Sequence, residues 1–248
     1  EATWNKIDSL NQTRIQKLSS WAVDIILNQY LHAWKIDIGP VLNLFHFNQL
    51  EGASPRLTLR SGESFAKYFT VGGYYGYGFK DQYPHDSTRN TGLHSYGGNI
   101  QWRFGPTKRN NLALTYDHKT ERIGYDDSDI YAETRVHDIE NLVNSWVMIY
   151  RPVSVLMRGK IGIQYQYEKP GFKFKVNAFT QNYYGNRFIP LIHKGAEVPH
   201  YSQIGLRTDF RLSWQQSSLD YFFHRIYLAS RYPVVHLTAE GGYIKIPG

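Results

Sequence analysis

The sequence predicts an all-β protein, an antiparallel transmembrane β-barrel of which roughly ten strands can be recognised by their pattern. Three observations lead to this prediction. Strand-like segments alternate apolar and polar residues with a period of two, aromatic residues make up 16% of the chain, and long connections alternate with short ones. Tyr and Trp rings favour membrane–water interfaces, where one end of the side chain is apolar and the other is wet.

The clearest strand pair is predicted over residues 160–181. Before position 169 the odd-numbered positions are Ile or Tyr, and the even-numbered positions are Lys, Gly, Gln or Glu. After the Lys-Pro-Gly turn at 169–171 the parity reverses, so that even-numbered positions are apolar and the odd ones begin with Lys, Lys and Asn. Two such runs around a Pro-Gly turn predict a β-hairpin. Each strand is about ten residues long, which matches a tilted transmembrane strand.

The other elements follow from the same patterns. A loose helical spacing of apolar residues predicts an N-terminal helix over residues 1–30. Residues 119–158 break the alternation, and apolar residues at helical spacing predict a helix inside this long extracellular loop. Further strands are expected at residues 34–38, 56–60, 65–79, 93–104, 112–116, 203–214, 220–230 and 233–245. The predicted organisation is a helical segment at 1–30 and a barrel at 31–248, which we expect to be part of a larger barrel.

Loop lengths distinguish the two ends of the predicted barrel. The long connections are 80–92, 119–158 and 183–202, and the short ones are 61–63, 105–110, 169–171 and 215–219. Outer-membrane barrels have short turns on the periplasmic side and longer loops outside. By this rule for loop lengths, the short turn at 169–171 is predicted to lie on the periplasmic side.

The polar parity of the predicted strands carries charges that would line the lumen of a barrel. These residues are Lys160, Glu168, Lys173, Lys175, Arg207, Asp209 and Arg211. The Ile, Tyr and Phe side chains of the other parity would then face lipid. The same alternation also fits a soluble sheet with one solvated face, so a soluble β-sandwich binding module is an alternative.

The amino-acid composition excludes several classes of protein. The chain has no cysteine, which excludes a disulfide framework and a Cys-ligated zinc site. Its net charge of +7 is spread along the chain without a basic block or a nucleic-acid-binding motif, so no nucleic-acid partner is expected. No apolar run is long enough for a transmembrane helix. The histidines and carboxylates show no metal-ligand spacing, and we expect neither a metal nor a cofactor.

One short run resembles a catalytic motif. His85-Asp86-Ser87 is similar to the His-x-Ser segment of the outer-membrane phospholipase A family, in which an asparagine orients the histidine that activates the serine. Asn99 follows Ser87 at the offset of that asparagine. The resemblance implies a lipid-hydrolysing site of Ser87, His85 and Asn99, although Thr88-Arg89 replace the family's Asn-Gly. A solvent-exposed turn is the other interpretation.

Several short runs together resemble a second family, the barrel region of large Bacteroidota outer-membrane proteins that carry a carboxypeptidase-regulatory-like domain ahead of the barrel. The runs are Asn48 to Gly52, Arg56 to Arg60, Tyr77 to Asp81, Tyr167-Glu168, Tyr201 to Ile204 with Leu206-Arg207, and Ser230 to Val234. The resemblance implies an incomplete barrel without catalytic residues. These barrels are distantly similar to BamA-type assembly barrels, which implies a role in outer-membrane assembly or export.

The leading expectation is therefore a non-enzymatic, integral β-barrel protein of a Gram-negative outer membrane, with a structural or accessory role in protein assembly, export or transport. Its expected partners are the lipid bilayer and other outer-membrane or periplasmic proteins. The outer-membrane phospholipase and the soluble binding module remain the alternatives from other functional classes.

Overall fold

A computed structural model shows how these elements fold. It describes residues 30–39, 44–48, 50–62, 64–80, 94–105, 109–122, 155–186, 189–221, 224–228 and 230–246. All secondary structure in these residues is β, and no helix in them is long and apolar enough to cross a membrane. The predicted N-terminal helix covers residues 1–30, of which only Tyr30 is described, and the helix predicted inside the long loop falls within 123–154, outside the described residues.

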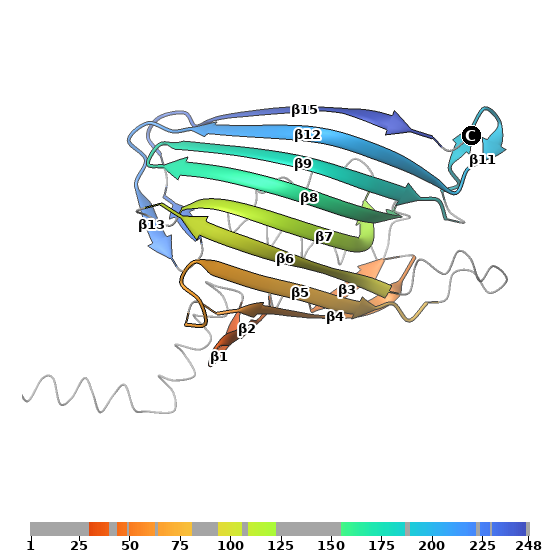
Figure 1. The fold of residues 1–248 in the computed structure, drawn as a ribbon, viewed down its shortest axis with the longest axis horizontal. Coiled ribbons are helices and arrows are strands. Elements are labelled where there is room, and N and C mark those ends of the chain that lie inside the picture. Colours follow the sequence, from red (N-terminus) through yellow and green to blue (C-terminus); the bar gives the residue numbers. More distant parts are fainter. Residues whose placement is uncertain are drawn as a thin grey trace, which may run out of the picture.

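One 11-stranded antiparallel sheet forms the body of the molecule (Figure 1). Its strands are β1 (Leu31–Ala33), β2 (Ile36–Ile38), β3 (Phe45–Asn48), β4 (Gly52–Ser61), β5 (Phe69–Tyr77), β6 (His94–Phe104), β7 (Asn110–Arg122), β8 (Val155–Lys169), β9 (Phe172–Tyr184), β12 (His200–Leu212) and β15 (Val235–Lys245). From β4 to β9 each strand pairs with the next one along the chain, and β9-β12-β15 continue the order. The prediction of an antiparallel all-β fold is confirmed.

The described sheet is open. Its path runs from β1 at one edge to β15 at the other, and the described strands at these edges do not pair with each other. The edges also differ in length, since β1 has 3 residues and β15 has 11. A closed barrel is therefore not present among the described residues.

The two ends of the sheet carry different connections. We call the end with the connections 62–68, 105–109 and 170–171 the turn end, and the opposite end, with 78–93, 123–154 and 185–199, the loop end. Figure 1 shows the turn end at the left and the loop end at the right. Among the connections from β4 to β15, the predicted alternation of long and short connections thus sorts them to opposite ends, with one exception at 213–234.

The predicted hairpin of residues 160–181 is the β8–β9 pair, which extends beyond both predicted limits. Its register pairs Ile163 with Ala178 and Glu168 with Lys173, so the apolar and the charged parities fall on opposite faces. The turn requires Gly171, because its φ of 77° lies in the left-handed region that favours glycine. A Cβ there would also lie 2.7 Å from the carbonyl oxygen of Ser213.

Two sequence predictions are wrong. Residues 220–230 do not form a strand of the main sheet, because β13 (Ser218–Tyr221) and β14 (His224–Tyr227) pair with each other as a separate hairpin. Hydropathy alone does not distinguish one long strand from two short strands that reverse between them. The predicted loop 119–158 is also too long, since its first and last four residues belong to β7 and β8.

A small apolar core lies at the loop end. Leu156 on β8 packs with Leu191 and Val198, which flank the hairpin of β10 (Ile192–His193) and β11 (Ala196–Glu197). The Tyr201 hydroxyl donates a hydrogen bond to the Ile192 carbonyl oxygen at 2.7 Å. The described residues of this connection, 185–186 and 189–199, are therefore structured and contribute to a small apolar core at the loop end.

Candidate functional site: a buried charged face

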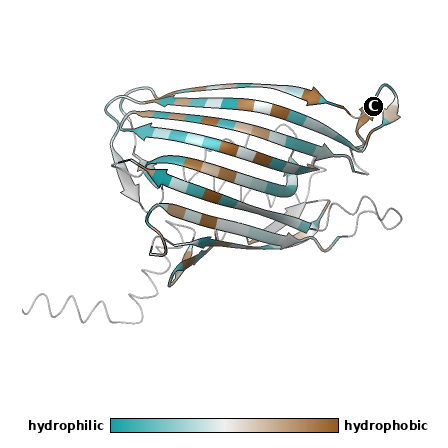
Figure 2. Cartoon of the chain, viewed as in Figure 1, coloured by the Kyte–Doolittle hydropathy of each residue, from teal (hydrophilic) through white to brown (hydrophobic). Residues whose placement is uncertain are grey.

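The strand register separates the side chains of the sheet into two faces, because directly opposite residues of antiparallel strands point the same way. The apolar face carries Leu57, Leu59, Val71, Tyr75, Ile100, Trp102, Leu114, Ile163, Tyr165, Leu206 and Leu237. The charged face carries Arg56, Arg60, Arg103, Asp117, Arg158, Lys160, Glu168, Lys173, Lys175, Arg207, Asp209 and Arg211. Figure 2 shows the resulting hydropathy bands along the strands.

Burial of the two faces is the reverse of that in a soluble protein. Ile163 is 56% exposed and Leu206 is 50% exposed, whereas Glu168 is 6% exposed and Asp209 is 2% exposed. Charged side chains are rarely buried unless they are paired, and large apolar side chains usually form the core. The apolar face is therefore expected to contact a non-aqueous environment, and the buried charges are expected to pair with one another.

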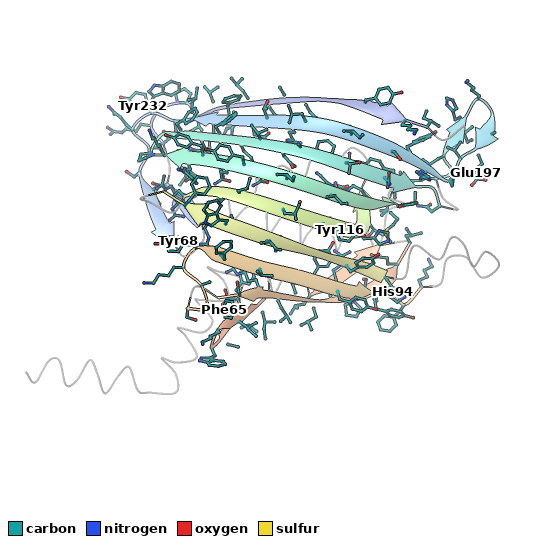
Figure 3. All side chains as sticks on the ribbon, in the orientation of Figure 1. Phe65, Tyr68, His94, Tyr116, Glu197 and Tyr232 are labelled. Carbon is teal, nitrogen blue, oxygen red and sulfur yellow. The ribbon has the colours of Figure 1, made fainter. Side chains whose placement is uncertain are left out.

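Aromatic rings gather in two bands on the apolar face. At the turn end, a band runs across β5, β6, β8, β9 and β12 through the contacts Phe69–Trp102, Trp102–Phe104, Phe104–Tyr165, Tyr167–Phe172 and Phe174–Phe210. At the loop end, another band contains Tyr75–His94, Tyr77–His94, Tyr96–His118, His118–Tyr184 and Tyr184–His200. Figure 3 labels His94 near the loop end, and Phe65, Tyr68 and Tyr232 near the turn end.

Aliphatic residues separate these two aromatic bands. One cross-strand row runs through Val71, Ile100, Leu114, Ile163, Ala178 and Leu206. On β6, Tyr96 of the loop-end band and Trp102 of the turn-end band are about 20 Å apart along the strand, from the rise per residue. This separation is close to the apolar band of outer-membrane barrels, which is about 25 Å tall between its aromatic girdles.

All seven charges that the sequence singled out lie on the charged face. Six of them gather toward the turn end. Five of these form adjacent cross-strand pairs: Glu168 is opposite Lys173, Lys173 opposite Arg211, and Lys175 opposite Asp209. Arg207 completes this group by donating to Asp209 through Nε at 3.1 Å. Lys160 lies apart from them, with its ammonium 4.7 Å from the ring centroid of Phe179.

The β13–β14 hairpin adds residues to this group that the sequence did not indicate. The Tyr227 hydroxyl donates to Glu168 Oε1 at 3.0 Å, and Arg225 Nη1 lies 3.3 Å from the same oxygen. The Arg211 guanidinium stacks 3.7 Å from the ring centroid of Tyr227. We call Glu168, Lys173, Lys175, Asp209, Arg211, Arg225 and Tyr227 the turn-end cluster. Only the position of the hairpin in three dimensions connects Arg225 and Tyr227 to the sheet.

A second polar cluster lies at the loop end, and the sequence did not predict it either. Glu51 is fully buried, and it accepts hydrogen bonds from Ser95 Oγ at 2.6 Å and from Thr120 Oγ1 at 2.9 Å. Arg56 Nη2 lies 3.7 Å from its Oε2. Glu51 follows β3 and yet contacts β6 and β7, which the chain order alone does not predict.

Gly97 on β6 and Gly78, just after β5, make room for side chains that lie across neighbouring strands. A Cβ at Gly78 would lie 2.8 Å from the Glu51 Cβ, and one at Gly97 would lie 2.5 Å from the ring of Tyr74. The Tyr74 hydroxyl reaches over Gly97 to donate to Asp117 Oδ1 at 3.1 Å. The loop-end side chains therefore lie across the strands and link them.

The predicted phospholipase residues are only partly covered by the structure. His85 and Ser87 lie outside the described residues. Asn99 lies on β6 on the charged face, opposite Gly72 and Thr115. In the described residues no group of three or more His, Asp or Glu side chains is placed to hold a metal ion. Because His85 and Ser87 are not described, the Ser-His-Asn site stays a prediction from the sequence.

In comparisons with known proteins, no protein-family model, no curated protein and no solved structure matches this chain.

Proposed function

We propose that this chain forms part of a transmembrane β-barrel of a Gram-negative outer membrane, with its charged face toward the lumen and its apolar face toward lipid. The observation that carries the proposal is the reversed burial of the two faces, together with the two aromatic bands at the ends of the apolar face. Outer-membrane barrels combine an outward apolar band, flanking aromatic girdles and a polar interior.

The size of the apolar face supports lipid as its natural environment. Burying one Leu, Ile or Phe side chain away from water is worth about 1.5–3 kcal/mol. Exposed large apolar residues occur on each of β4, β5, β6, β7, β8, β12 and β15. A contiguous apolar surface of this extent is unusual for a soluble monomer. A bilayer covers such a face without any further protein element.

The alternative of a soluble β-sandwich needs a second layer over the apolar face. Among the described strands, the small hairpins β10–β11 and β13–β14 are the only sheets besides the main one. The residues that flank β10–β11 pack with Leu156 of the small core, and β13–β14 contacts Glu168 of the charged face. The described part of the chain therefore offers no second layer that would cover Ile163 or Leu206.

We propose that the protein has a structural or accessory role in protein assembly, export or transport within the membrane. It is supported by the resemblance of the sequence to the barrel region of Bacteroidota outer-membrane proteins, and by a charged face whose residues pair with one another. The short turns of the turn end would lie in the periplasm. The proposed partners are lipid and other outer-membrane or periplasmic proteins.

The absence of native cysteine makes site-directed spin labelling a direct test. Ile163→Cys and Gln164→Cys place labels on neighbouring residues of β8 whose side chains lie on opposite faces. In protein reconstituted into lipid vesicles, dissolved oxygen should relax the label at 163 more strongly, and a water-soluble nickel complex should relax the label at 164 more strongly. Phe174→Cys and Lys175→Cys give a second matched pair on β9.

Equal relaxation of both labels by the nickel complex would contradict the membrane proposal. Extraction of the native protein without detergent, as a monodisperse monomer, would contradict it independently.

A further inference from the structure

The apolar face carries a row of polar residues at the loop end. This cross-strand row runs from His118 on β7 through Gly159 on β8, Asn182 on β9 and Ser202 on β12 to Lys245 on β15. We call these five residues the loop-end polar row. Each residue lies directly opposite the next, so their side chains point to the same side of the sheet. Every position of the row except the glycine therefore presents a hydrogen-bonding or charged group on this face.

The corresponding row at the turn end has a different composition. It runs from Lys169 on β8 through Phe172 and Leu212 to Val235 on β15. Both rows contain one lysine, but the row neighbours of Lys169 are all apolar. Lys245 instead shares its row with a hydroxyl, an amide and an imidazole group. The polar groups of the loop-end polar row are therefore not a general feature of the ends of this sheet.

The side chains of the loop-end polar row are available to a ligand, since none of the four makes a hydrogen bond or an ion pair in the described part of the chain. Gly159 also leaves space within the row. A Cβ at this position would meet nothing closer than His118 Nδ1, at 3.6 Å, and the Tyr184 hydroxyl oxygen would lie 4.0 Å away. The Tyr184 ring in turn contacts the His200 ring, with centroids 5.9 Å apart. Polar atoms from β7 and β9 thus flank the space above Gly159 on β8.

The row lies at the edge of the apolar band. On β12, Ser202 and Phe210 of the turn-end aromatic band are about 27 Å apart along the strand, from the rise per residue. The apolar band of outer-membrane barrels is about 25 Å tall. In the proposed membrane orientation, the row therefore lies where the lipid tails meet the headgroups of the outer leaflet. Polar groups without partners are costly in hydrocarbon, whereas phosphate oxygens in the headgroup region accept hydrogen bonds.

We propose that the loop-end polar row binds the phosphate of a lipid headgroup in the outer leaflet. Lys245 supplies a positive charge, and His118, Asn182 and Ser202 supply hydrogen-bond donors, a combination that matches the charge and the acceptor oxygens of a phosphate. The proposal rests on the proposed function, because the row reaches the headgroups only when the apolar face contacts lipid. It deepens that function by naming the lipid group that this face recognises.

A fluorophore on β9 can report which lipids lie beside the row. Thr180→Cys introduces the only thiol of the chain, at an exposed position on the same face and two residues before Asn182. The full chain is reconstituted into phosphatidylcholine vesicles that contain a low fraction of spin-labelled phosphatidic acid or of spin-labelled phosphatidylcholine. The spin labels are on the acyl chains, and fluorescence quenching measures the local concentration of each lipid.

Spin-labelled phosphatidic acid should associate about fivefold more strongly than spin-labelled phosphatidylcholine beside Thr180→Cys, as expected for one lysine near an anionic headgroup. Phe174→Cys is the matched reporter, because it lies on the same strand and face, two residues after Phe172 of the turn-end row. Its preference for phosphatidic acid should be much smaller. Equal preferences at the two reporters would overturn the proposed site.

Three variants in the Thr180→Cys background test the residues of the row. Lys245→Gln should remove most of the preference for phosphatidic acid, and its exposed position makes a folding defect unlikely to interfere. Asn182→Leu keeps the size of the side chain and should lower the preference by a smaller factor. Lys169→Gln removes the same charge from the turn end and should leave the preference unchanged. An equal loss in Lys169→Gln and Lys245→Gln would show attraction by net charge alone and would overturn the site.

The same experiment separates this site from the proposed function. Equal quenching by both spin-labelled lipids would overturn the phosphate site and leave the contact of the apolar face with lipid intact. Quenching by neither lipid at either reporter would contradict the membrane proposal itself, and the phosphate site with it.

Discussion

Glu51 and Ser95 are joined by a 2.6 Å hydrogen bond although Glu51 precedes β4, Ser95 lies on β6, and β5 separates these two strands. Both side chains are fully buried. The contact is possible because Gly76 and Gly78 leave space for Arg56 and Glu51 to cross. The sheet is thus linked across its strands by side chains as well as by its backbone ladder, and this link is open to mutational tests.

Glu51→Ala is expected to lower the free energy of unfolding by about 3–5 kcal/mol, because it leaves the buried Arg56 without its carboxylate. It also removes the acceptor of Ser95 and Thr120. Urea titration of reconstituted protein, followed by heat-modifiable gel mobility, measures the change. Glu197→Ala, at an exposed position on β11, is the control and should stay within about 0.5 kcal/mol of the parent. Equal effects of the two substitutions would contradict the role of Glu51.

Gly78→Ala is expected to destabilise the protein by about 1–3 kcal/mol, because the new methyl group would overpack the site. Its Cβ would lie 2.8 Å from the Glu51 Cβ and 3.0 Å from the Glu51 carbonyl oxygen. Gly241→Ala is the matched control, since nothing lies within 4 Å of a Cβ at that position. The same urea titration compares both variants. A larger loss for Gly241→Ala would show that the crossing at Gly78 is not tightly packed.

Gly171→Ala tests the turn of the β8–β9 hairpin. A left-handed backbone conformation costs a non-glycine residue about 1–2 kcal/mol, and the Cβ would also meet the Ser213 carbonyl oxygen at 2.7 Å. Gly195→Ala shares a similar positive φ, 81° against 77°, without any atom within 4 Å of the new Cβ. Gly171→Ala should therefore be the more destabilising of the two. Equal losses would mean that the turn moves away from Ser213 without cost.

Ile163→Lys is expected to reduce the free energy of folding into lipid vesicles by about 2–4 kcal/mol, the cost of lysine on a lipid face near the bilayer midplane. Gln164→Lys adds the same charge to the charged face of the same strand and should have a much smaller effect. Folding is measured as the heat-modifiable fraction over a urea series. A similar loss in both variants would count against lipid contact at Ile163.

The faces of the long strands were predictable from the sequence because side chains alternate along any β-strand, whatever its neighbours are. The register of β8, β9 and β12 accordingly places Lys160, Glu168 and Arg207 on one face, as the parity of their positions requires. The short turn at 169–171 was predictable for the same local reason, since Gly171 provides the φ that the turn needs.

The partners of those charges were not predictable. Glu168 binds Tyr227 across 59 positions of sequence, and Glu51 binds Thr120 across 69. Such contacts depend on the three-dimensional path that the chain takes beyond the end of each strand. The alternation of residues 220–230 fits a wall strand as well as it fits the hairpin that β13 and β14 form.

The sequence by itself therefore determined which side chains share a face, since this follows from the two-residue period of a strand. Only the tertiary structure decided that the charged face is the buried one, that Glu51 and the β13–β14 hairpin fold against it, and that the described sheet stays open between β1 and β15. These features arise from contacts between distant segments, and local periodicity carries no information about them.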